Sequence, residues 1–125
     1  MCGVCATDIS RHHHPFPLPQ ITGHEVIGYL LNDDLQPTQL VVIEINDSHL
    51  AHASPSASSC RYCNCPQEEG MDHHCPARTT IGIDRLPGGF APYVLAPVNA
   101  IVPVPSEMPI RCAALAEPFA AALQV

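Results

Sequence analysis

The 125-residue chain contains no lysine and no tryptophan, and only 14% of its residues are charged. Twelve acidic residues outnumber five arginines, which gives a formal net charge of -7. A surface of that sign repels phosphate backbones, so the composition argues against a nucleic-acid partner. No uninterrupted apolar run approaches the roughly 18 residues needed to cross a bilayer, which argues against a membrane protein.

Other absences narrow the class of protein further. The opening MCGVCATDIS has no signal-peptide pattern, which predicts a cytoplasmic protein. The seven cysteines are an odd number and cannot all pair within one molecule, so metal binding is the better expectation. No internal repeat is visible. The seven glycines nowhere form the GxGxxG pattern of a dinucleotide-binding turn, so this chain has no nicotinamide site of its own.

The remaining composition fits one small domain over residues 1–125. A hydrophobic fraction of 46% argues against disorder, and the length is too short for two domains. The chain opens inside a motif and ends inside the Ala-rich apolar segment 113–125, so we expect a domain truncated at both ends.

Local patterns predict a mostly β domain with helix at its end. Apolar β-branched runs predict strands, and turn residues separate the first two of them. The strands are expected at 24–31, 40–45, 90–95 and 100–104, with loops at 11–23 and 46–59. Ser106 is a candidate N-cap of one helix with Pro109 near its start, and Pro118 fits the first turn of a second helix.

Cys5 and His24 form the first candidate metal site. A thiolate and an imidazole are ligands that zinc prefers, although each residue alone is equally explained by ordinary burial. Thr7 and Asp8 follow Cys5 directly. A carboxylate behind a ligating histidine fixes its tautomer, so we predict that role for Asp8, and a proton-passing role for the Thr7 hydroxyl.

Two glutamates compete for the third ligand position of this site. Glu25 follows His24 on the predicted strand, where successive side chains point to opposite faces, so both reach one ion only if the chain is locally distorted. We therefore expect Glu25 behind the ligands or as an alternating ligand, and Glu117 as the third ligand. On its own, Glu117 is equally explained as a solvated carboxylate at a helix end.

Four cysteines in residues 60–75 form the second candidate site. This lobe has no periodic apolar pattern, so burial alone cannot fold it, whereas a tetrahedral zinc can. The predicted ligands are Cys60, Cys63, Cys65 and Cys75, with His73 or His74 as replacements and free thiols as the alternative. Cys2 and Cys112 are expected to be small buried residues.

Taken together, the segments resemble the catalytic domain of the zinc-dependent alcohol dehydrogenases in the medium-chain dehydrogenase/reductase superfamily, near its threonine and sorbitol dehydrogenase-like members. The resemblance runs in order from Cys2 to Val125. It is carried by GVCATD, GHEVIGYL, VVIEIN, CPARTTIGI, GGFAPYVLAPVNAIVPVP and AALAEPFAAAL.

The resemblance implies a GroES-like, partly open β-barrel with a structural zinc lobe. It also implies a catalytic zinc lined by Cys5, His24 and Glu117, and a Rossmann domain that this chain lacks. Two departures from the family stand out. The third lobe cysteine arrives one place early, at Cys65. The histidine that many relatives carry after the TD pair is absent; whether Ser10 or one of the histidines 12–14 substitutes for it is open, and a solvated loop is the simpler interpretation of the histidine run.

The expected function is the oxygen-activating half of an NAD(P)-dependent dehydrogenase for a small alcohol or polyol. The full protein would supply a Rossmann domain in the same chain and would form a homo-oligomer, and the isolated chain would not turn over. The sequence leaves two alternatives open: a zinc-binding β-domain without catalysis, and an inert remnant of a dehydrogenase.

Overall fold

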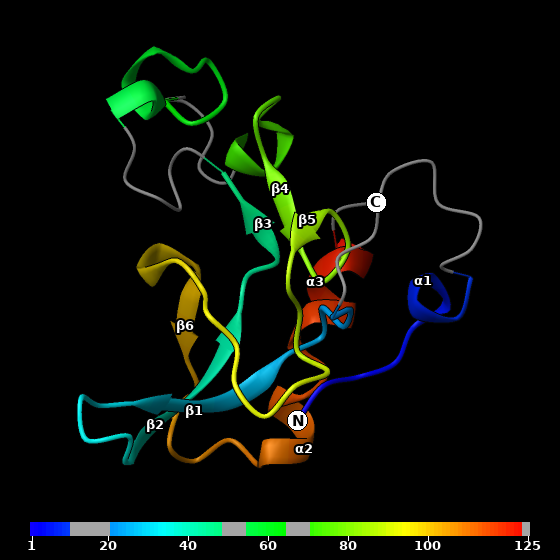
Figure 1. Cartoon of the computed structure of the whole chain (residues 1–125), viewed down its shortest axis with the longest axis vertical. Coiled ribbons are helices and arrows are strands. Elements are labelled where there is room, and N and C mark those ends of the chain that lie inside the picture. Colours follow the sequence, from blue (N-terminus) through cyan, green and yellow to red (C-terminus); the bar gives the residue numbers. More distant parts are fainter. Residues whose placement is uncertain (11–20, 49–54, 65–70, 124–125) are drawn as a thin grey trace.

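The computed structural model describes residues 1–10, 21–48, 55–64 and 71–123. Among the described residues, strands outnumber α-helices, and the longest α-helix comes last in the chain (Figure 1). The strands are β1 (Ile27–Leu31), β2 (Pro37–Ile43), β3 (Asn46–Asp47), β4 (Thr79–Ile81), β5 (Arg85–Leu86) and β6 (Ile101–Pro103). The α-helices are α1 (Ala6–Ile9), α2 (Ile110–Ala113) and α3 (Ala116–Leu123), and 3-10 turns cover Pro55–Ser59, Met71–His74 and Val98–Ala100.

Two small sheets form the body of the domain. The first has the strand order β1-β2-β6 and is antiparallel throughout. The second has the order β3-β4-β5, with β3 antiparallel and β5 parallel to the central strand. The chain passes from the first sheet to the second between Ile43 and Asn46, so the two sheets are covalently adjacent.

The hairpin between β1 and β2 forms where turn residues were predicted. The Asn32 side-chain oxygen accepts hydrogen bonds from the backbone N–H groups of Asp34 and Gln36, at 3.1 and 2.8 Å. An asparagine that bonds the following backbone in this way stabilises a tight turn. The side chain therefore sets the turn, and Ile27 pairs with Val42 further along the ladder.

The core divides into two clusters, one for each sheet. Ile27, Val104 and Ala113 bring the first sheet against α2, and Ile43, Ile81 and Ala100 join the two sheets. Both clusters are small, so each buried side chain carries a large share of the domain's stability. Among the described residues, no helix is both long enough and apolar enough to cross a membrane.

Three of the local predictions need correction. Residues 90–95 are not a strand, because Gly88, Gly89 and Phe90 direct their N–H groups to the crossing segment 21–23 instead of a neighbouring strand. Ser106 is not an N-cap, because α2 starts after Pro109 and the Ser106 hydroxyl donates to Glu107.

The third correction is Cys112, which is exposed rather than buried, whereas Cys2 is half-buried. Helix α2 is a single turn, and Ala113 is the residue that it packs into the core. Pro118 does lie in the first turn of α3, as predicted, and Glu117 precedes it there.

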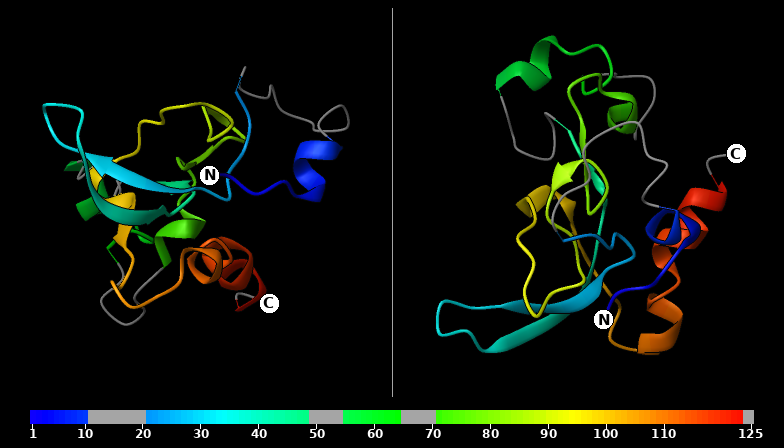
Figure 2. Two further views of the ribbon diagram at one scale, coloured as in Figure 1. Left: turned by 90° about the horizontal axis from the view of Figure 1, so that it is seen from below. Right: turned by 45° about the vertical axis from the view of Figure 1, so that its right-hand side comes forward.

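The loop predictions are only partly testable. The histidines 12–14 and most of the predicted loop 11–23 lie outside the described residues, as do residues 49–54 of the second loop and Cys65. Within the second loop, β3 and the 3-10 turn Pro55–Ser59 interrupt the irregular chain. The cysteine lobe lies at the opposite end of the domain from the β1–β2 hairpin (Figures 1 and 2).

Candidate metal centre

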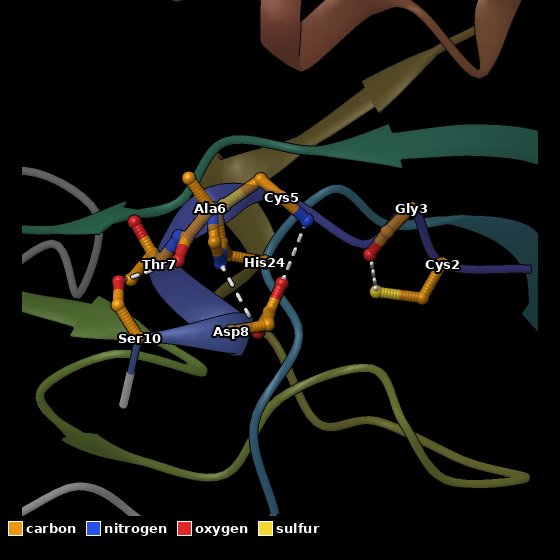
Figure 3. Close-up of polar contacts among 8 residues, drawn as sticks. All are labelled: Cys2, Gly3, Cys5, Ala6, Thr7, Asp8, Ser10 and His24. Carbon is orange, nitrogen blue, oxygen red and sulfur yellow. Dashed lines mark hydrogen bonds and ion pairs between the residues drawn. The ribbon is translucent and has the colours of Figure 1, made fainter. Parts of the chain in front are cut away.

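Cys5 and His24 meet although 19 residues separate them. The Cys5 Sγ lies 3.1 Å from the His24 Nε2 (Figure 3). His24 is only 5% exposed, and Cys5 is half-buried at the start of α1. One thiol and one imidazole therefore share a protected position, as the ligand types predicted.

The short helix α1 holds the Cys5 sulfur in place. Cys5 is its N-cap, and the Sγ accepts the backbone N–H of Thr7 at 3.2 Å. Asp8 completes a capping box by accepting the backbone N–H of Cys5 at 3.1 Å. N-cap residues satisfy otherwise unpaired helix donors, so the ligand sulfur is part of the element that positions it.

Asp8 also faces the far side of the His24 ring. Its Oδ1 lies 4.0 Å from the His24 Nδ1, and both side chains are 6% exposed. Neither of these two buried atoms has a hydrogen-bond partner, and the gap is too long for a hydrogen bond. A hydrogen bond between these two buried atoms would remove the cost of leaving both unsatisfied. It would place the ring proton on Nδ1 and leave Nε2 free to bind a metal.

Glu25 joins this pair. Ligand atoms of Cys5, His24 and Glu25 all lie within 4.8 Å of one another. The alternation argument against this pairing does not apply, because β1 starts only at Ile27 and the Val26 N–H donates back to the His24 carbonyl at 3.1 Å. Such a three-residue turn centred on Glu25 breaks the extended geometry that would separate the two side chains.

Glu117 is not part of that compact group, but it lies close enough to interact with it electrostatically. Partial burial raises the pKa of the Glu117 carboxyl, the charge of His24 opposes this, and the carboxylates of Glu25 and Glu44 raise it further. The third-ligand role predicted for Glu117 therefore stays a prediction, alongside Glu25. Glu44 is a further carboxylate whose charge acts on Glu117, and no sequence motif singled it out.

The other predicted residues of this site occupy α1. Thr7 is half-buried in its first turn, and its proton-passing role stays a prediction. The Ser10 hydroxyl donates to the Ala6 carbonyl at 2.6 Å, so the helix end already satisfies it.

The cysteine lobe provides the second group. Ligand atoms of Cys60, Cys63 and Cys75 lie within 4.8 Å of one another, and the sulfurs of Cys60 and Cys75 are 3.8 Å apart. Cys75 is 2% exposed. The rings of the proposed replacement ligands His73 and His74 contact each other in a tilted arrangement with centroids 4.1 Å apart, and neither residue belongs to the three-cysteine group.

With this geometry established, comparison with known proteins identifies the domain. The family model of the alcohol dehydrogenase GroES-like domain matches residues 1–106. The chain belongs to this family. Its mostly β fold with a cysteine cluster and a C-terminal helix confirms the predicted GroES-like class.

Individual relatives are dehydrogenases. The chain is 27% identical over 124 residues to L-threonine 3-dehydrogenase of Mesorhizobium japonicum, a match that covers 93% of this chain and 33% of that protein. It is 30% identical over 125 residues to D-arabinitol dehydrogenase 1 of Uromyces fabae, covering 98% and 33%.

A solved structure of a dehydrogenase is also similar to this chain. A protein described as a zinc-binding dehydrogenase from Sinorhizobium meliloti, with NADP bound, matches with a TM-score of 0.68 at 30% identity, covering 98% of this chain and 34% of that one. The chain thus spans about a third of the length of the relatives it matches. Its two Cys-containing groups are candidate zinc sites of this GroES-like domain.

Proposed function

We propose that this GroES-like domain activates the oxygen of a small secondary alcohol or polyol for NAD(P)-dependent oxidation. The observation that carries the proposal is the approach of the Cys5 sulfur to the His24 ring, 3.1 Å apart, with Glu25 in the same group. The names of the relatives, a threonine and an arabinitol dehydrogenase, support a hydroxyl-bearing substrate.

The residues present fit a zinc ion. Thiolate, imidazole and carboxylate are a donor set that borderline-soft zinc accepts, and three protein ligands leave a fourth position open. The unpartnered Nδ1 of His24 and Oδ1 of Asp8 complete the pattern of a ligating histidine with a carboxylate behind it. When bound, zinc supplies a Lewis acid that makes an alcohol proton easier to remove.

Each side chain then has a defined task. Cys5 and His24 hold the ion, Asp8 orients His24, and either Glu25 or Glu117 supplies the carboxylate ligand. We assign to the Thr7 hydroxyl the transfer of the alcohol proton away from the buried site. The lobe cysteines Cys60, Cys63, Cys65 and Cys75 hold a second, structural zinc.

The hydride acceptor has to be bound elsewhere in the full protein. We assign it to a Rossmann domain in the same polypeptide, with homo-oligomer formation as a property of that longer protein. The isolated chain is therefore expected not to oxidise alcohols with NAD(P). Detectable turnover by the purified chain would contradict this part of the proposal.

Zinc content tests the metal sites directly. Purified protein should contain two zinc ions per chain by elemental analysis, and Cys5→Ala should remove one of them. The matched control is Cys112→Ala, because Cys112 is exposed and lies in neither group. Two zinc ions in Cys5→Ala would show that Cys5 is not a ligand.

A paired substitution assigns the third ligand. Glu25→Gln and Glu117→Gln each remove one carboxylate, and the ligand is the residue whose loss weakens zinc binding at the Cys5 site more. Glu107→Gln is the control, because Glu107 is an exposed carboxylate that accepts a hydrogen bond from the hydroxyl of neighbouring Ser106. Equal, control-like affinity in both variants would exclude a carboxylate ligand.

The compact three-cysteine group also bears on the alternatives. Converging sulfurs support a metal-binding lobe over an inert remnant, whose thiols would have no reason to meet. A zinc-binding domain without catalysis is distinguished by its failure to support alcohol oxidation when it is joined to a Rossmann domain. That outcome would overturn the dehydrogenase proposal and leave the two metal sites intact.

A further inference from the structure

The segment that carries His24 and Glu25 lies outside the regular strands, so something else must hold it. Three backbone N–H groups from one loop do so. Gly88 donates to the Ile21 carbonyl at 2.8 Å, Gly89 to the Gly23 carbonyl at 2.8 Å, and Phe90 to the Thr22 carbonyl at 3.0 Å. The loop therefore runs along the residues immediately before the candidate metal ligands.

The contact between these segments leaves no room for side chains. A Cβ added at Gly82 or at Gly88 would overlap the Gly23 carbonyl oxygen, and at Gly88 it would also overlap the Cα of Gly82. These are backbone atoms, which cannot rotate away as a side chain can. Three glycines thus bring three backbone segments together directly beside His24.

Two of these glycines are also required by their backbone conformation. Gly23 has a φ of 96° and Gly82 a φ of 71°, in the left-handed region that side chains disfavour. Gly88 is different, because it has no such φ and only the lack of space restricts it. A substitution at Gly88 therefore reports on the contact alone.

We propose that Gly82 and Gly88 are positioning residues for His24, because they fix the Gly23 carbonyl one residue before it. This inference rests on the proposed zinc function. A methyl group at Gly88 has to displace the Gly23 carbonyl, and the displacement carries His24 away from Cys5 and Asp8. Metal–ligand distances tolerate only about 0.2 Å of error, so such a shift weakens zinc binding while leaving the ligands chemically unchanged.

The structure provides a matched control. Gly28 lies in β1, and a Cβ added there meets nothing within 4 Å. Gly28→Ala and Gly88→Ala are thus the same chemical change, one in open space and one against the Gly23 carbonyl. A difference between them isolates the effect of the contact.

The experiment measures how zinc protects individual cysteines of the purified chain from iodoacetamide, using peptide mass spectrometry. For Gly88→Ala we expect the zinc concentration that half-protects Cys5 to rise about 10- to 100-fold, the range found when residues supporting metal ligands are changed. Gly28→Ala should match the unaltered chain. The zinc concentration that half-protects Cys75, which belongs to the separate three-cysteine group, should stay unchanged, and amide hydrogen exchange of β1 and β2 reports that the domain stays folded.

The outcomes separate the two proposals. If zinc does not protect Cys5 in the unaltered chain, the zinc function fails, and the positioning role fails with it. If zinc protects Cys5 equally well in the unaltered chain and in Gly88→Ala, the positioning role is overturned and the zinc site stands.

A second variant decides the matter if Gly88→Ala does not fold. The Phe90 ring packs against Gly23 from the same loop, and Phe90 is 42% exposed, so its removal leaves the core intact. Phe90→Ala loosens the contact without a clash, and it should raise the half-protecting zinc concentration for Cys5 but not change Cys75. An unchanged concentration for Cys5 would overturn the positioning role.

Discussion

The two candidate metal groups are built in opposite ways. Cys5, His24 and Glu25 are held by elements with hydrogen bonds and packing of their own: a capped helix, a glycine contact and the strand that follows. Cys60, Cys63 and Cys75 belong to a lobe of 3-10 turns. Among its described side chains between 55 and 78, Cys75 is the only buried apolar one.

This difference predicts that the Cys5 group is preorganised and that the lobe depends on metal binding for its fold. A site whose ligands are held by packed backbone keeps its geometry when it is empty. Little of the free energy of metal or substrate binding is then needed to order the ligands. A lobe without a core has to use metal binding to offset the entropy of ordering its chain. We therefore expect cysteine to serve a different purpose in each of the two candidate groups.

The largest expected difference between the two groups is their response to removal of zinc with a chelator. We expect the lobe to lose its protection from amide hydrogen exchange while β1 and β2 keep theirs. Structural zinc contributes roughly 10–16 kcal/mol of apparent binding free energy in finger-type peptides, which exceeds what so small a lobe can replace. Equal protection in both regions after chelation would show that the lobe folds without metal.

Single ligand substitutions sharpen the comparison further. Cys75→Ser places a hydroxyl at a 2% exposed position, at a cost of about 1–3 kcal/mol in addition to the lost zinc site. In the zinc-free chain, Cys5→Ser should change the free energy of unfolding by less than about 1 kcal/mol, because serine is itself a good N-cap. Chemical denaturation of both variants checks this, and a larger loss for Cys5→Ser would reverse the assignment of roles.

Thiol reactivity separates Cys2 from the exposed surface. Burial, with help from the charge of Asp8, raises the pKa of the Cys2 thiol from 9.0 to about 11. At pH 8 its thiolate population is about 100-fold lower than for an unshifted thiol, and alkylation should speed up roughly tenfold for each pH unit up to 10. Exposed Cys112 should react quickly and serves as the internal reference. Equal rates at pH 8 would mean that the segment containing Cys2 opens readily.

The carboxylate behind His24 provides a further test of the Cys5 group. Asp8→Asn keeps the size of the side chain but removes its charge, so zinc affinity at the Cys5 site should fall about 10- to 100-fold. Asp34→Asn, in the exposed hairpin turn, is the control. Metal titration of both variants checks the prediction, and an unchanged affinity in Asp8→Asn would exclude the orienting role.

Local chemistry was predicted best where a single residue determines it. Asn32 sets its turn through its own side chain, and Pro118 fits the first turn of α3 because its missing N–H has no partner there. The meeting of Cys5 with His24 was also predicted, from ligand chemistry and from the family resemblance.

The failures occur where distant segments decide the structure. Residues 90–95 have the composition of a strand, but the loop before them bonds to segment 21–23 rather than to a strand edge. The alternation rule set Glu25 apart from His24, because a turn stabilised by one backbone hydrogen bond is not visible in a strand-like sequence. Cys112 was misplaced because one helical turn has too little periodicity to show which face is buried.

The sequence by itself determined the family, the sheet-forming hairpin and the chemical identity of both candidate metal groups, because these depend on residue type and short spacing. Only the tertiary structure decided that Glu25 joins the Cys5–His24 pair in a compact group, and that Gly23, Gly82 and Gly88 meet beside it. A close contact between backbone segments that are far apart in the chain is visible in the sequence only as a glycine. The sequence shows each of those glycines, but only the folded chain shows which atoms require them.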